Sequence, residues 1–168
     1  MKKRKLKNID AHFDCLPSVN SSIPFNALAE TLSAHLYELY RGTVVFSCAE
    51  DRAITHVSCD AARLFVCLRL LLDCADENHP IRVHLSLDEE HSAALTVCMQ
   101  RERELPEKEL RMIAMLGHLR LRINDEGAHL GMEAKREKVL HLFALDIASL
   151  DQIFNKINRM FEEIPNKV

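Results

Sequence analysis

The stretch VSCDAARLFVCLRLLLDCADENHPIRVHLSL, residues 57–87, decides the fold of this chain. Its first half repeats apolar residues at the spacing of one buried helix face, and its second half alternates apolar with polar residues, as a half-buried strand does. Asp60 stands at the N-cap position, and Pro80 stands where a helix cannot continue. The stretch therefore predicts a capped, almost wholly apolar helix that ends near Ala75 and leads into a strand over residues 81–87.

Around this unit, the sequence pattern predicts strands in hairpins that are separated by helices. Residues 53–57 can pair back on 43–48, and residues 94–99 on 81–87. Ser149, followed by Gln152, forms a capping box that should open a terminal helix. Further strands are expected at 118–124 and 138–145, further helices are expected to begin at Asn26 and Glu107 and to end at Gly42 and Gly117, and residues 128–137 fit neither pattern.

This order of elements predicts an α+β fold. We expect a two-layer α/β sandwich, in which a mixed, mostly antiparallel sheet carries helices on one face, plus an appended C-terminal helix. At 168 residues the chain is long enough for one such core and too short for two. The expected organisation is an irregular basic lead-in over residues 1–22, one domain over 23–145 and an appended amphipathic helix over 146–168.

The charge distribution argues against nucleic acid as a partner. Five of the 22 basic residues fall in the first eight positions, so the rest of the chain carries 17 basic against 25 acidic side chains. A short basic tip on an acidic body is not the profile of a nucleic-acid-binding domain, and the scarcity of aromatic residues disfavours base stacking. No run approaches the roughly 20 apolar residues of a membrane span, and no secretory signal follows the basic tip. We therefore expect a cytoplasmic protein that binds neither nucleic acid nor membrane.

The six cysteines form no C-x-x-C pair, and the histidines form no H-x-x-x-H or H-E-x-x-H pair. Cys67 and Cys74 are seven residues apart, too far to bond along one helix. We expect buried, reduced thiols and no metal site. A thiol sensor that uses Cys67, Cys74 or Cys98 is the alternative.

Residues 23–145 resemble the ATP-binding domain of sensor histidine kinases, which has the GHKL or Bergerat fold of gyrase-type ATPases. IPFNALAETLSAHLYELYRGTVVFSC resembles the opening helix and first strand of that family. VSCDAARLFVCLRLLLDCA resembles its Asp-x-x-Arg-Leu lead into the helix that carries an essential Asn, and VHLSLDEEHSAALTVCM resembles the hairpin that follows. The order, spacing and lengths of these segments carry the resemblance, and it implies a Bergerat-like sheet with helices on one face.

The central helix departs from the family at the residue that holds Mg²⁺. In the family an Asn, usually followed by Ala, holds the cation that bridges the nucleotide phosphates, and Cys74-Ala75 stands at that place here. The polar position one turn earlier corresponds to Leu70. Because a neutral thiol is a poor ligand for a hard cation, the resemblance implies no metal here.

The glycines that cradle the nucleotide in the family are also replaced. The family's Asp-x-Gly-x-Gly corresponds to Gln100, Glu102 and Glu104. Side chains therefore stand where glycine lets the backbone approach the nucleotide, and two carboxylates would repel a triphosphate. The second glycine box and the lid have no room between residues 105–110 and Gly117.

The resemblance and these departures together predict a non-catalytic, nucleotide-free pseudo-ATPase module that needs no cofactor and regulates signalling by binding a protein. By the resemblance, the partner would be a response regulator, a kinase or a related signalling protein. The alternative is a residual ATP-binding kinase or phosphotransfer protein that acts on a partner. Two surfaces are candidates for contact: the acidic end of the central helix, and the apolar stripe of the terminal helix, which its own sheet or another chain, a second copy included, must cover. Their residues are Asp73, Asp76 and Glu77 on the first, and Ile153, Ile157, Met160 and Phe161 on the second.

Overall fold

One sheet of seven strands and four helices make up the part of the chain that the computed structural model describes, residues 19–51, 54–88, 92–136 and 145–163. The strands are β1 (Ser21–Pro24), β2 (Val44–Cys48), β3 (Thr55–Cys59), β4 (Ile81–Asp88), β5 (Ser92–Cys98), β6 (Arg120–Asn124) and β7 (Gly127–Arg136). The helices are α2 (Phe25–Tyr40), α3 (Ala61–Asp73), α4 (Glu107–Leu116) and α5 (Ile147–Glu163).

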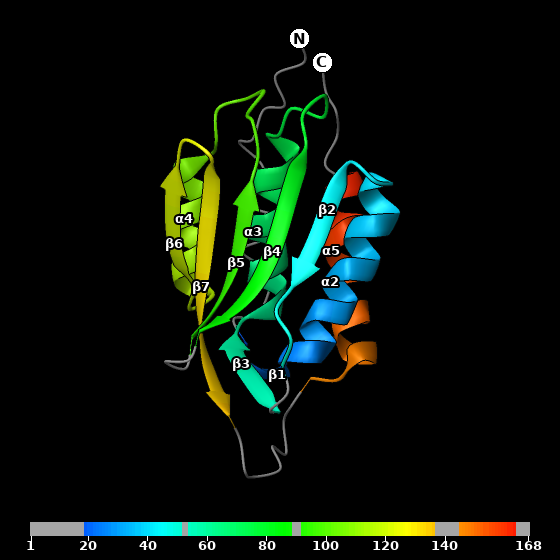
Figure 1. Ribbon diagram of the computed structural model, residues 1–168, viewed down its shortest axis with the longest axis vertical. Coiled ribbons are helices and arrows are strands. Elements are labelled where there is room, and N and C mark those ends of the chain that lie inside the picture. The colour runs from blue at the N-terminus through cyan, green and yellow to red at the C-terminus, as the bar shows by residue number, and fades with distance from the viewer. Residues whose placement is uncertain (1–18, 52–53, 89–91, 137–144, 164–168) are drawn as a thin grey trace.

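The strands follow the order β1-β3-β7-β5-β4-β2, and β6 also pairs with β7 (Figure 1). β2 pairs with β4 in parallel, and the remaining pairings of the described strands are antiparallel. β5 occupies one edge of the long strand β7, and β6 and β3 share its other edge. The predicted mixed, mostly antiparallel sheet is therefore confirmed.

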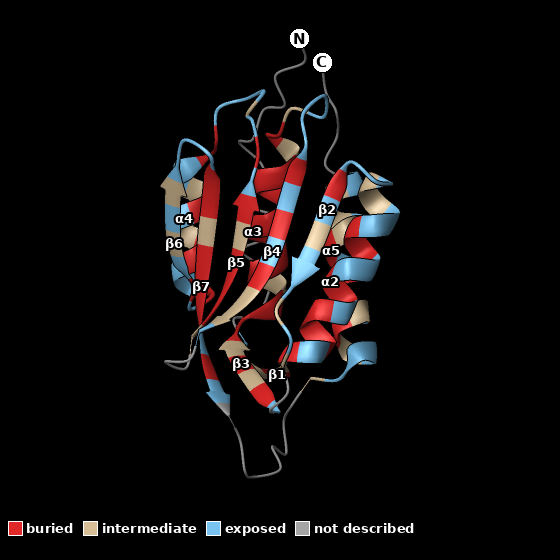
Figure 2. Cartoon of the chain, in the orientation of Figure 1, coloured by how far each residue is buried: buried red, intermediate tan, exposed pale blue. Residues whose placement is uncertain are grey.

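The described helices cover one face of this sheet and leave the other face open (Figure 1). Along β4, Ile81, Val83 and Leu85 are buried beneath the helices, whereas Arg82 and His84 are exposed on the open face (Figure 2). The alternation read from the sequence thus sets which side of the strand enters the core.

α3 lies in the helical layer as the sequence predicts. Its N-cap Asp60 accepts a hydrogen bond from the backbone N–H of Arg63 at 3.1 Å, and Leu64 and Leu68 are fully buried. The helix ends at Asp73, two residues before the predicted Ala75. The decisive stretch therefore folds as a capped apolar helix followed by a half-buried strand.

α5 packs in the angle between α2 and α3. It does not pack on the sheet, which was one of the two alternatives considered from the sequence. Phe154 is fully buried, and its ring stacks on Phe65 of α3 with 4.1 Å between the ring centroids. Leu150 and Ile157 are also buried. The apolar stripe of the terminal helix is therefore covered by helices of the same chain.

The strands differ from the prediction at two places. Residues 53–57 were expected to pair with 43–48, but β3 lies between β1 and β7, and β2 pairs with β4. Parallel neighbours need a crossover connection, and β3 with α3 supplies it. Ser21 and Ser22, expected to be irregular, belong to β1. The expected strand 138–145 lies outside the described residues except for Leu145, which is not in a strand, and the undecided segment 128–137 falls almost entirely in β7.

Two helix ends also differ. The carboxylate of Asp146 accepts a hydrogen bond from the backbone N–H of Ser149 at 2.8 Å, so Asp146 takes the capping role that was expected of Ser149. The same hydrogen bond lowers the pKa of Asp146. At the end of α2, Arg41 adopts the left-handed conformation that was expected of Gly42, and Gly42 follows with φ of 92°.

Candidate functional site

The sequence-predicted site lies where α3 ends beside the segment that follows β5. Cys74 is the C-cap of α3 and is 6% exposed. Its backbone carbonyl accepts hydrogen bonds from the N–H groups of Glu102 at 2.9 Å and Arg103 at 3.3 Å. The N–H of Asp76 donates to the carbonyl of Gln100 at 2.8 Å. Residues 74–76 and 100–104 are thus joined directly, backbone to backbone.

The Cys74 side chain takes part in the same junction. Its thiol lies 3.6 Å from the carbonyl oxygen of Glu104, and Ala75 forms a bridge with Arg101. Burial raises the pKa of the Cys74 thiol to about 11, and the neighbouring Asp73 carboxylate adds to that effect. The thiol is therefore protonated near neutral pH and is a poor ligand and a poor nucleophile.

The other replaced positions divide between core and solvent. Leu70 is 1% exposed and belongs to the core. Gln100, Glu102 and Glu104 are exposed, so both carboxylates project into water. The structure therefore brings the backbones of these predicted positions together, but not their polar side chains.

At the acidic end of α3, the carboxylate of Asp76 is hydrogen-bonded within a local turn. The Asp76 carboxylate accepts hydrogen bonds from the backbone N–H and the side-chain amide of Asn78, both at 3.0 Å, and contacts His79 Nδ1 at 2.6 Å. The bond from the Asn78 backbone is the largest of the effects that lower the pKa of Asp76. Asp73 is half-buried, and Glu77 is exposed.

The predicted contact residues of α5 are turned toward the chain itself. Ile157 is 1% exposed, and Ile153, Met160 and Phe161 are half-buried against the core. The guanidinium of Arg69, on α3, lies 4.6 Å from the centre of the Phe161 ring. In the described arrangement these side chains serve the packing of α5.

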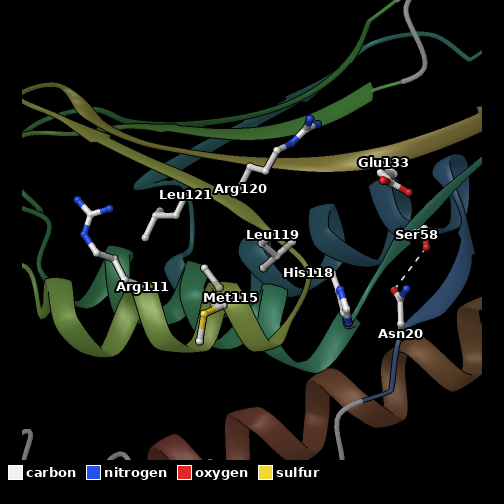
Figure 3. Close-up of a pocket in the computed structure, with 10 residues that line it drawn as sticks. Asn20, Ser58, Arg111, Met115, His118, Leu119, Arg120, Leu121 and Glu133 are labelled. Carbon is white, nitrogen blue, oxygen red and sulfur yellow. Dashed lines mark hydrogen bonds between the residues drawn. The ribbon is translucent and has the colours of Figure 1, made fainter.

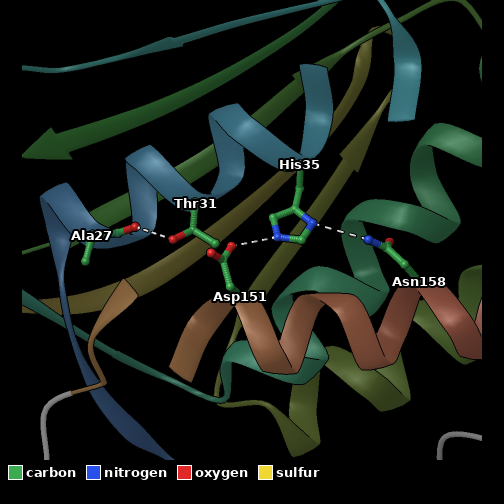
Figure 4. A network of polar contacts seen from close by, with 5 residues as sticks. All are labelled: Ala27, Thr31, His35, Asp151 and Asn158. Carbon is green, nitrogen blue, oxygen red and sulfur yellow. Dashed lines mark hydrogen bonds and ion pairs between the residues drawn. The ribbon is translucent and has the colours of Figure 1, made fainter. Parts of the chain in front are cut away.

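A polar network that was not predicted from the sequence fastens α5 to α2 and α3, and Figure 4 shows the part of it between α2 and α5. Arg69 donates to Asn158 Oδ1, so the Asn158 amide faces His35 Nδ1, at 3.2 Å. That assignment leaves the proton of His35 on Nε2, which donates to Asp151 at 2.9 Å. No local pattern could have revealed this network, because His35 is separated by more than a hundred residues from its partners on α5.

The structure also contains a groove that the sequence analysis missed. It has a volume of about 520 Å³ and lies between α4 and β6, with Ser58 and Asn20 at one end (Figure 3). Leu119 and Leu121 point toward α4, whereas Arg120 points away from it.

Among the described residues, no three His, Cys, Asp or Glu side chains are placed to hold a metal ion.

No protein-family model matches the sequence, and no curated protein matches it. Among solved structures, the chain is similar to the cytoplasmic segment of the histidine kinase QseC, with a TM-score of 0.51 and 16% identity over 80% of this chain and 94% of that one. It is also similar to full-length ShkA in complex with AMPPNP, with a TM-score of 0.50 and 11% identity over 77% of this chain and 35% of that one.

These likenesses concern the fold, since the identities are low. In the part of the chain that the structure describes, no helix is both long and apolar enough to span a membrane. The sheet order, the capped central helix and the two structural likenesses agree with the resemblance seen in the sequence. The chain has an α+β fold similar to that of the cytoplasmic segment of a histidine kinase.

Proposed function

We propose that this chain is a non-catalytic, nucleotide-free module of histidine-kinase type that regulates signalling by binding a protein. The observation that carries the proposal is the direct junction of residues 74–76 with residues 100–104. In the resembling family these two segments carry the metal-holding Asn and the first glycine box. No ligand can lie between their backbones while these hydrogen bonds are made.

The chemistry of the junction supports the same conclusion. A protonated, buried Cys74 thiol replaces the amide that a hard cation needs. The exposed carboxylates of Glu102 and Glu104 would repel the phosphates of an approaching nucleotide. Opening the junction would also leave the carbonyl of Cys74 without its two donors, which costs free energy when the group stays buried.

Isothermal titration calorimetry with Mg²⁺ and AMPPNP tests the proposal on the full chain. ShkA, whose structure holds AMPPNP, is the positive control in the same buffer. We expect heat of binding for ShkA and none for this chain up to millimolar nucleotide. Binding in the micromolar range would refute the proposal, as would transfer of labelled phosphate from ATP to a partner that Cys74→Ala abolishes.

The partner we propose is a response regulator, a kinase or a related signalling protein, and the place of action is the cytoplasm. The five cysteines in the described residues are free thiols, as suits a reducing compartment. Self-association through α5 is less well supported than a heterologous partner, because Phe154 and Ile157 are buried within the chain. Light scattering at micromolar concentration should give a monomer, and a dimer that Phe161→Asp disrupts would show that α5 is an interface.

A further inference from the structure

The open face of the sheet presents a continuous row of polar side chains across five strands. The strand registers align Arg122 of β6 with His129 of β7, and His129 with Thr96 of β5. They continue from Thr96 to His84 of β4 and from His84 to Ser47 of β2. These five residues face away from the helical layer, because strand side chains alternate between the faces.

Hydrogen bonds and close packing order this row. Thr96 Oγ1 lies 3.1 Å from His129 Nδ1, and Ser47 Oγ lies 2.7 Å from His84 Nδ1. Next to the row, the Arg120 side chain extends across Gly131, where a Cβ would come within 3.2 Å of Arg120 Nε. The guanidinium of Arg120 therefore lies close along the sheet, away from α4 (Figure 3).

The centre of this face is positively charged. Arg82, Arg120 and Arg122 are exposed and form no ion pair with any residue of the described part of the chain. Two carboxylates of the face, Asp88 and Glu133, lie together in another row, where both align with Ser92, and Asp125 and Glu126 line a pocket with Arg82 at the edge of the face. Partial burial lowers the pKa of His129, and the positive charges of the nearby Arg122 and Arg120 lower it further.

We infer that this basic face, defined by Arg82, Arg120, Arg122, His84 and His129, binds a carboxylate-rich surface of a protein partner. The inference rests on the proposed protein-binding function and names the surface and the chemistry that would carry it. The guanidinium fork matches a carboxylate with two parallel hydrogen bonds, and the hydroxyl groups in the row can complete the polar contact.

Charge complementarity favours an acidic protein over nucleic acid. The whole chain has a net charge of −3, so the basic face is a local feature on an acidic molecule. Three arginines next to a row of carboxylates suit a compact acidic patch better than a long polyanion, which needs many phosphate contacts. The row carries no Phe, Tyr or Trp side chain on which bases could stack.

Fluorescence anisotropy on the full chain tests this surface, with a labelled oligoglutamate peptide as the acidic probe and a DNA duplex as the competing class. The test variant is Arg120→Glu with Arg122→Glu. The matched control is Lys156→Glu with Arg159→Glu, which makes the same change of net charge on the exposed side of α5. Circular dichroism melting verifies that both variants fold. If the test variant does not fold, Arg120→Ala with Arg122→Ala replaces it.

We expect the unmodified chain to bind the peptide at low ionic strength, the test variant to bind about tenfold or more weakly, and the control to change by less than about twofold. The inference is overturned by no binding of the peptide, by equal losses in both variants, or by tighter binding of the duplex through the same arginines. These outcomes leave the nucleotide titration untouched, whereas nucleotide binding would refute the proposed function without altering peptide binding. The two failures are therefore distinguishable.

Discussion

Replacing Asp60 by alanine is expected to remove the ion pair and the N-cap that begin α3. The Asp60 side chain is 2% exposed and accepts three hydrogen bonds. They come from the backbone N–H of Arg63 at 3.1 Å, from its guanidinium at 2.7 Å, and from the backbone N–H of Val19 at 3.2 Å. Alanine offers no acceptor, so these three hydrogen bonds are lost.

The magnitude follows from what remains buried. An N-cap is worth about 1 kcal/mol. Breaking a buried ion pair by removing one of its members costs about 3–5 kcal/mol, and the side chain of Arg63 is only 7% exposed. Because one carboxylate serves both roles, the terms overlap, and we expect a loss of about 4 kcal/mol in the free energy of unfolding. Asp60→Asn keeps an acceptor for the helix N-terminus and should cost about half as much.

Urea unfolding followed by circular dichroism measures these losses in a double-mutant cycle. Arg63→Met removes the cation and keeps most of the apolar stem, so Asp60→Ala should cost less in that background. We expect a coupling free energy of about 2 kcal/mol or more between the two positions. Losses that add within about 0.5 kcal/mol would refute the reasoning, because the buried carboxylate would then act independently of the guanidinium.

Three further changes test the packing, a turn and the buried thiols. Phe154→Ala should cost about 3–5 kcal/mol in urea unfolding, since it empties the space where α5 stacks on α3; a loss below about 1 kcal/mol would mean that α5 is undocked in solution. Gly127→Ala should lower the melting temperature strongly, because at φ of 147° a Cβ would lie 1.7 Å from the carbonyl oxygen of Val97; an unchanged melting curve would contradict the β6–β7 turn geometry. Burial raises the pKa of Cys59 and Cys67 from 9.0 to about 12, so the folded chain keeps these protons longer and the free energy of unfolding should fall as pH rises above about 9. The loss should reach about 1.4 kcal/mol per thiol at about pH 10 in urea titrations, and it should disappear in a variant with both cysteines changed to alanine.

Local periodicity predicts the elements whose burial follows from their own sequence. α3 and β4 were predicted because Leu64 and Leu68 share one helix face and because Ile81 and Val83 alternate with polar residues. The hairpin of β4 and β5 was predicted because both strands have this pattern and only a short polar turn separates them.

Pairing between distant segments could not be predicted in this way. β2 has an apolar, β-branched sequence that fits either neighbour, and its parallel partner β4 becomes available only once α3 has crossed over. Residues 128–137 were left undecided, and in β7 the buried Leu130 and Met132 lie on the core side of the strand. Tertiary packing on three neighbouring strands decided the conformation of β7.

The residue types of the candidate site could be predicted from the sequence, but the hydrogen bonds between its two segments could not. Cys74 and Glu102 could be placed by resemblance, whereas the hydrogen bonds between their backbones depend on how α3 meets the segment after β5. Likewise, the sequence shows the apolar stripe of α5 but not which elements pack against it. Arg69 and Asn158 select α2 and α3 as that cover through a network with no sequence signature.

The segments around Cys74 and the apolar stripe of α5 are both engaged in contacts within the chain. The junction at Cys74 joins the two segments that correspond, by resemblance, to the metal-holding helix end and the first glycine box, and the docking of Phe154 and Ile157 uses the apolar stripe of α5. At the acidic end of α3, Asp76 is already hydrogen-bonded within a turn. On the open face of the sheet, the exposed Arg120 and Arg122 have no ionic partner among the described residues. We therefore propose that a protein partner contacts the outer surface of the sheet.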